Sequence, residues 1–273
     1  PRQFEAFERR EIADYYAMVT ALDDCLGRLL EALEEWGLAE DTIVCFSSDH
    51  GDHLGAHGYG KPGVVDSWMD HTLQLSKGTP YEETAHSPFL LRYPARVPGN
   101  RRSRTFLNSI DVMPTLLGLI GGGVPDGVQG KDLAHTALGR PGDEPDSVYL
   151  QLLGPGWPDR IKSVGLWRAV RTERYTYARW ADCGGKRLLL DRQVDPLEMH
   201  NWVDDPEYRE IVDQLERRLQ AWMAETGDPF DTGRRLPQTD MLDLGQTFIR
   251  PEWYARAPQA YVAALAGNRP AGV

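Results

Sequence analysis

The stretch Asp41–His57, DTIVCFSSDHGDHLGAH, contains the strongest local indication of fold in this chain. It begins with the apolar, β-branched run Thr42–Phe46, which is typical of a strand buried in a parallel sheet. The run ends at Ser47–Gly51, whose residue types are common in turns and poor in strands. In open α/β sheets, ligands bind beyond the carboxyl ends of the strands. Asp49 and His50 are therefore the first candidates for a functional site.

Helical and apolar segments flank this strand. Glu11–Trp36 repeats apolar side chains every three or four positions, which predicts a long helix that ends at Gly37. Phe89–Tyr93 is a second short apolar run, which predicts another buried strand, and a helix follows from Asn108 or Ser109. The order of these elements predicts an α/β fold class. We expect the later portion of a mixed, mainly parallel sheet flanked by helices.

A change of periodicity near residue 143 predicts three parts. Residues 1–143 would form the C-terminal portion of the α/β domain. Residues 144–233 contain four short strand-like segments followed by a helix that Asp205 caps, which predicts a small antiparallel-sheet subdomain with one packed helix. Residues 234–273 are rich in Pro, Ala and Gly, and we expect them to form a peripheral tail.

Composition and charge exclude several classes of protein. The 273 residues carry a formal net charge of −11, so we expect no nucleic-acid partner, because binding to phosphates requires a basic face. No apolar run approaches the roughly 20 residues that a membrane helix requires. The three cysteines are widely spaced and indicate neither a disulfide framework nor a zinc pattern. The compartment, cytoplasmic or periplasmic, and the oligomeric state stay open.

The segment KGTPYE, which begins at Lys77, predicts a corner that binds an anion. Thr79, Pro80 and Glu82 have the spacing of a capping box, with Thr79 at the N-cap of a helix. A helix N-terminus offers free backbone N–H groups to an anion, and Lys77 would add a positive charge two residues before the cap.

Taken together, these segments resemble the sulfatase family of the alkaline-phosphatase-like superfamily. The resemblance rests on SSDHGDHLGAHG, KGTPYEETAHSPFLLRYP, NSIDVMPTLLGLIG, RAVRTERYTYARW and LLLDRQVDPLEMHNWVDDPE, and it extends from about Asp14 to Trp222. It implies the metal-dependent hydrolysis of a sulfate ester, with a small molecule or a carbohydrate as the substrate.

The resemblance also implies roles for five residues. Asp49 and His50 match the Asp-Asn or Asp-His pair that supplies two of the family's four side-chain ligands to a divalent metal ion, usually Ca²⁺. Imidazole also suits Mn²⁺ and Zn²⁺, so these ions are alternatives. Lys77 matches the lysine that contacts the sulfate ester, and Lys61, in HGYGKPG, is a rival. His57 matches a histidine often found near the substrate pocket.

The sequence departs from the family pattern at the nucleophile. Sulfatases use a formylglycine made from a cysteine in Cys-x-Pro-x-Arg or Cys-x-Ala-x-Arg, and Cys25, Cys45 and Cys183 all lack that context. The family's first pair of metal-binding aspartates is missing too, so we expect both features in an N-terminal part that precedes these residues. Two alternatives stay open. One is a phosphonate monoester or phosphodiester hydrolase of the same superfamily, and the other is a non-catalytic fragment or binding protein.

Overall fold

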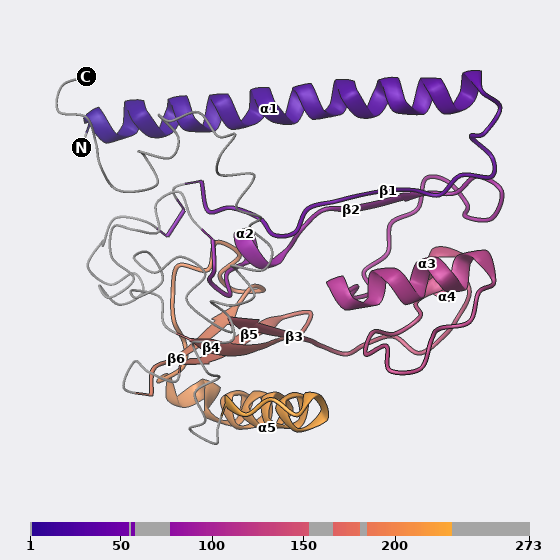
Figure 1. Ribbon diagram of the computed structural model, residues 1–273. Helices are drawn as coiled ribbons and strands as arrows, with labels where there is room; N and C mark the ends of the chain where they lie inside the picture. The colour runs from indigo at the N-terminus through magenta and orange to yellow at the C-terminus, as the bar shows by residue number, and fades with distance from the viewer. Residues whose placement is uncertain (1, 55, 58–76, 153–165, 181–184, 231–273) are drawn as a thin grey trace, which may run out of the picture. The chain divides into compact units, whose positions relative to one another are not determined.

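The computed structural model describes five stretches of the chain (Figure 1), namely residues 2–54, 56–57, 77–152, 166–180 and 185–230. The chain divides into two compact units, Pro1–Glu225 and Thr226–Val273, and the elements below belong to the first unit apart from the last residue of the final helix. None of the helices in the described stretches combines the length and the apolar character that crossing a bilayer requires.

The first element is a long helix, α1 (Arg2–Glu35), which begins earlier than the apolar repeat predicts. Gly37 has a φ of 67° and terminates the helix in the left-handed conformation, as predicted. Leu22 and Leu29, from the predicted apolar face, are 56% and 51% exposed. Within the described residues, this face of α1 is therefore not part of a core.

Two short strands, β1 (Val44–Ser47) and β2 (Phe89–Arg92), pair antiparallel in a two-stranded ribbon. The predicted mixed sheet would contain antiparallel as well as parallel pairs. Among the residues that the structure describes, no parallel pair occurs. The prediction that both strands are buried is wrong for this part of the chain, since Cys45 is exposed and Leu90 is 60% exposed. A strand becomes buried only where layers cover both of its faces.

A small helical layer packs against this ribbon. The 3₁₀ turn η1 (Ser109–Asp111) starts where the sequence predicts a helix, and it leads into α3 (Val112–Ile120), which ends at Gly121 with a φ of 76°. The short helix α4 (Ala134–Ala137) was not predicted. Leu119 and Ala134 form a buried cluster with Tyr93, and Ile43 and Leu91 of the ribbon region pack against it.

The C-terminal strands form the antiparallel meander that the sequence predicts. Its members are β3 (Val148–Leu152), β4 (Trp167–Arg171), β5 (Tyr175–Trp180) and β6 (Arg187–Asp191), hydrogen-bonded in that order. The 3₁₀ turn η3 (Pro206–Tyr208) then leads into α5 (Arg209–Thr226). Asp205 caps this turn, because its Oδ1 accepts a hydrogen bond of 2.9 Å from the Glu207 N–H.

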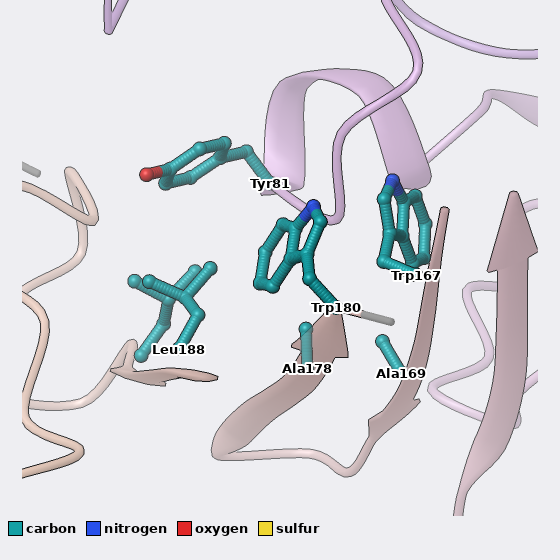
Figure 2. Packing of buried hydrophobic residues seen from close by; sticks show 7 residues of the cluster. Tyr81, Trp167, Ala169, Ala178, Trp180 and Leu188 are labelled. Atoms are coloured by element: carbon teal, nitrogen blue, oxygen red, sulfur yellow. The ribbon is translucent and has the colours of Figure 1, made fainter. Parts of the chain in front are cut away.

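Both faces of this sheet are covered. On one face, Tyr81 and Trp180 pack among buried residues of the strands (Figure 2), and Tyr81 directly precedes the short helix α2 (Glu82–Ala85). On the other face lies α5 (Figure 1), where the Tyr177 hydroxyl donates a hydrogen bond of 2.9 Å to Glu216. Because side chains alternate along a strand, one sheet supports both layers. The segment around α2 is thereby placed on a rigid surface.

Candidate active site

The loop after β1 carries Asp49 and His50 at the predicted carboxyl end of the strand. His50 Nδ1 lies 2.7 Å from the Gly51 carbonyl oxygen, so Nδ1 holds the ring proton and donates it, and Nε2 keeps its lone pair. Nε2 in turn lies 3.3 Å from Oδ2 of Asp49. Two acceptor atoms at this separation suit neighbouring positions around one cation, and a hydrogen bond from the other nitrogen is how metal-binding histidines are commonly oriented.

The surroundings of this pair also suit a metal ion. The Asp49 side chain is 82% exposed, which leaves space for ligands from other residues. A carboxylate oxygen and an imidazole nitrogen are donors that divalent ions accept, and a hard ion such as Ca²⁺ would require more oxygen ligands than this pair provides. Asp49 and His50 therefore fit part of a metal site.

Gly51 holds the same loop against α2. Its N–H donates a hydrogen bond of 3.0 Å to the Thr84 carbonyl oxygen. A Cβ atom at this position would overlap the Glu83 carbonyl group, so the close approach of the two backbones requires glycine. A second link joins His53 Nε2 to Thr79 Oγ1 at 2.7 Å. The Asp49 loop and the segment that follows Lys77 are thus fastened together.

The capping box predicted at Thr79 and Glu82 is wrong. α2 begins at Glu82 with Tyr81 at the N-cap position, and its N-cap side chain makes no capping hydrogen bond in the described structure. Thr79 Oγ1 instead contacts His53 and Thr84, and the Glu82 carboxylate forms an ion pair with Arg171. These tertiary partners engage the two side chains that the box would need. α2 is also a single turn of four residues, which is too short to provide the predicted anion-binding site at its N-terminus.

His57 lies in a partly buried cluster with His53 and Glu83. Its Nε2 is 3.1 Å from Oε2 of Glu83, and its ring stacks on Tyr81 with centroids 4.0 Å apart. Only 3% of the His57 side chain is exposed. Ligand atoms of His53, His57 and Glu83 lie within 4.8 Å of one another, so this cluster could also hold an ion of the zinc type. In both histidine rings Nε2 already makes a hydrogen bond, to Thr79 Oγ1 in the case of His53 and to Glu83 Oε2 in the case of His57.

Burial sets the charges in this cluster. It lowers the pKa of His53 to about 4, with a further contribution from the neighbouring His57, so His53 is neutral near pH 7. Burial also acts to raise the pKa of Glu83, but the hydrogen bond and the charge of His57 outweigh it and hold that pKa below its usual range. Glu83 is therefore a carboxylate that pairs with His57.

Lys77 lies exposed on the segment that leads to α2. The next residue, Gly78, has a φ of 92°, and its carbonyl oxygen accepts a hydrogen bond of 2.9 Å from Trp167 Nε1. Lys61 lies outside the described residues. Of the predicted site residues, the structure brings Asp49 and His50 into contact and links their loop to the segment of Lys77.

Three further charged residues surround α2 and were not singled out from the sequence. Arg171 and Arg192 both pair with the Glu82 carboxylate, the latter at 3.5 Å. Burial acts to raise the pKa of Glu82, but the hydrogen bond from Arg171 and the charges of both arginines hold it below its usual range. These contacts join positions far apart in the chain, and no local spacing indicates them.

Glu198 is the third of these residues and is only 1% exposed. Its Oε2 accepts a hydrogen bond of 2.8 Å from the Glu82 N–H, across 116 positions of sequence. Burial raises the pKa of Glu198 to about 7, and the charges of Glu82 and Glu83 add to this effect while the Glu82 N–H opposes it. The segment DPLEMH around it was identified only through the family resemblance.

Comparison with known proteins assigns the chain to a family. The model of the sulfatase family matches residues 1–122, and the model described as N-sulphoglucosamine sulphohydrolase, C-terminal, matches residues 71–225. An ulvan-active sulfatase of Formosa agariphila is 34% identical over 235 residues, which cover 84% of this chain and 42% of that relative. The chain spans about two fifths of the length of the curated relatives it matches.

Solved structures agree with this result. A candidate sulfatase from Bacteroides fragilis matches with a TM-score of 0.65 and 30% identity, over 79% of this chain and 43% of the other. The phosphonate monoester hydrolase of Agrobacterium radiobacter matches with a TM-score of 0.64 and 26% identity, over 77% and 40% of the two chains. The α/β fold class with an antiparallel C-terminal sheet is thereby confirmed. The chain belongs to the sulfatase family and matches the C-terminal part of its members.

Proposed function

We propose that this chain is part of a metal-dependent sulfatase, a hydrolase that cleaves a sulfate ester. The observation that carries the proposal is the pairing of Asp49 with His50. In a member of this family, a histidine whose Nδ1 is anchored to a backbone carbonyl and whose Nε2 faces a carboxylate is suited to bind a metal ion.

Asp49 Oδ2 and His50 Nε2 would supply two ligands to a divalent ion. When bound, such an ion polarises a sulfate oxygen and lowers the barrier to attack on sulfur. We propose Ca²⁺, with Mn²⁺ or Zn²⁺ as alternatives, because the imidazole nitrogen is a ligand that these softer ions also accept. The Gly51 carbonyl group keeps His50 in the tautomer that can bind the ion.

Lys77 would contact the sulfate ester and balance the negative charge that builds up in the transition state. Lys61 is the alternative for this role. His57 would support the site through Glu83 and Tyr81, which it contacts, and so would influence the substrate pocket from a buried position. The nucleophile, a formylglycine in this family, would come from residues outside this chain.

The substrate class follows from family membership and charge. The C-terminal family model is named for a sulphohydrolase of a sulphated amino sugar, so a carbohydrate sulfate is the substrate we propose, with a small-molecule sulfate ester as the alternative. The net charge of −11 means that an anionic substrate would have to be held by local cations such as Lys77.

A phosphonate monoester or phosphodiester hydrolase is the second candidate. It is favoured by the structural match to the phosphonate monoester hydrolase of Agrobacterium radiobacter. The coding DNA upstream of Pro1 provides the first test. A Cys-x-Pro-x-Arg or Cys-x-Ala-x-Arg motif with a pair of aspartates supports the sulfatase, whereas an upstream region without that cysteine motif supports the phosphonate reading. Rates on matched aryl sulfate, phosphodiester and phosphonate esters then decide between them.

The role of Asp49 is tested in the full-length protein. We expect Asp49→Ala to lower kcat/KM on an aryl sulfate by about 1,000-fold or more, because it removes a metal ligand. The melting temperature of the metal-free protein should change little, since the side chain is exposed. Asp41→Ala is the control. It changes an exposed aspartate that precedes the N-terminal end of β1, and it should retain full activity. Undiminished turnover by Asp49→Ala, with metal content unchanged, contradicts the assignment.

A further inference from the structure

The backbone that follows Lys77 is fastened at three residues to the C-terminal sheet and to the segment after β6. Gly78 accepts the hydrogen bond from Trp167 Nε1, and Tyr81 is fully buried against the sheet. The Glu82 N–H donates to Glu198, and the Glu82 carboxylate pairs with Arg171. The sheet and the segment after β6 therefore restrain the path of residues 78–82.

Trp167 is the first of these contacts after Lys77 along the chain. It is 5% exposed and packs beside Trp180, with ring centroids 6.4 Å apart (Figure 2). A ring held in this way has little freedom, and its indole N–H can only donate. Gly78, by contrast, has no side chain of its own to restrain it, and its φ of 92° is a region that glycine enters easily. The orientation of the Gly78–Thr79 peptide therefore depends on the hydrogen bond that its carbonyl group accepts from Trp167.

We propose that Trp167 is a positioning residue for Lys77, acting through the Gly78 carbonyl group. The inference rests on the proposed function, in which Lys77 contacts the sulfate ester. The C-terminal sheet thereby contributes to catalysis without contacting the substrate, because it sets the direction in which the lysine leaves the backbone. Small displacements of a charged group that faces the transition state cost substantial rate.

The first test is Trp167→Phe in the full-length protein, which removes the indole N–H and keeps an aromatic ring. We expect kcat on an aryl sulfate to fall about tenfold, with a smaller change in KM, because charge on the ester grows in the transition state. Trp222→Phe is the matched control, since it removes an indole hydrogen bond of 3.0 Å to Ser147, on the other face of the sheet. It should lower stability to a similar extent and leave kcat unchanged.

Gly78→Ala tests the same peptide without altering the core. A Cβ at Gly78 meets no atom within 4 Å, so the substitution acts through backbone strain alone at this positive φ. We expect a loss of kcat similar to that of Trp167→Phe, at a melting temperature above that of the tryptophan variant. If both variants retain the kcat of the parent, the positioning role is contradicted.

A double-mutant cycle separates this inference from the proposed function. In a Lys77→Ala background, Trp167→Phe should cause no further loss of kcat or of affinity for inorganic sulfate, which is measurable even where turnover is very slow. Independent, multiplicative losses overturn the positioning role and leave the function of Lys77 intact. If Lys77→Ala alone changes neither rate nor sulfate binding, the proposed role of Lys77 itself fails.

Discussion

The C-terminal sheet and the β1–β2 ribbon differ sharply in how they bury apolar side chains. Val170, Tyr177 and Leu189 of the sheet are fully buried. In the ribbon region, Leu90 of β2 is 60% exposed, and Leu22 of α1 is 56% exposed. Both regions have the apolar residues of ordinary core elements. The difference lies in whether the described residues supply a second layer.

A local pattern specifies a helix or strand, whereas the burial of that element depends on partners elsewhere in the chain. α5 covers one face of the sheet and the α2 segment covers the other (Figure 1), so both faces are buried. The apolar face of α1 is of a kind that normally packs against another layer. We expect that layer to come from residues outside this chain in the full-length protein. Substitutions of Leu189 and Leu90 test this prediction.

The largest effect is expected from a pair of matched leucine substitutions. Leu189→Ala removes a fully buried side chain and should lower the free energy of unfolding by about 2–5 kcal/mol. Leu90→Ala in this chain alone should change it by less than about 0.5 kcal/mol, because the side chain is mostly exposed. Urea unfolding monitored by circular dichroism measures both.

The same two substitutions in the full-length protein show whether β2 is covered there. If Leu90→Ala then lowers the free energy of unfolding by about 1 kcal/mol or more, residues outside this chain cover β2. If the cost stays small there, the ribbon is an exposed edge in the whole protein as well, and the expectation of a covering layer is wrong.

A smaller effect is expected from Glu198, which links the segment after β6 to α2. The folded protein raises its pKa from the usual 4.5 to about 7, so the stability linked to its proton is present below pH 4.5 and is lost as pH rises through 7. Glu82 and Glu83 from α2, with Arg171 and Arg192 from the sheet side, are the charges that surround it.

Glu198→Gln keeps an acceptor for the Glu82 N–H but cannot ionise. Relative to this variant, the parent protein should lose about 3 kcal/mol of stability between pH 4.5 and pH 8. Denaturant midpoints across this range provide the measurement. Parallel pH profiles for the two proteins contradict the raised pKa, and Gln214→Glu, on the exposed face of α5, restores the overall charge when it is combined with Glu198→Gln.

The smallest effect is expected at Arg104, which lies in the loop between β2 and η1 and pairs at 3.4 Å with Glu173, between β4 and β5. The two side chains are 94% and 80% exposed, so water and salt screen their attraction. Arg104→Ala should change the free energy of unfolding by less than about 0.5 kcal/mol. A larger loss that disappears in 1 M salt would show that exposed charges, as well as the buried contacts of α2, hold the regions together.

Much of the fold could be predicted because it depends on neighbouring residues. Gly37 and Gly121 end helices since each must adopt a positive φ, and Asp205 caps the turn before α5 through a local hydrogen bond. The four strands of the meander follow from short apolar runs between turns. The position of Asp49 and His50 after a strand was predicted for the same reason.

The environment of α2 could not be predicted in this way. Thr79 and Glu82 have the spacing of a capping box, yet His53 and Arg171 engage their side chains. Glu198 approaches Glu82 across 116 positions, a contact that no local pattern encodes. Long-range partners compete with local ones, and here a buried hydrogen bond to His53 and an ion pair with Arg171 prevail, because little water is present to replace or weaken them.

From the residues alone, the family resemblance and the order of the elements could be predicted, and Asp49, His50 and Lys77 could be proposed as candidates for binding a metal ion and a sulfate ester. These follow from local geometry and from motif spacing, which neighbouring residues control. Three features depend on tertiary packing: His57 is buried against Glu83, Trp167 binds the Gly78 carbonyl group, and the C-terminal sheet is covered on both faces while Leu90 of the ribbon stays exposed. Such contacts depend on which distant surfaces meet when the chain packs.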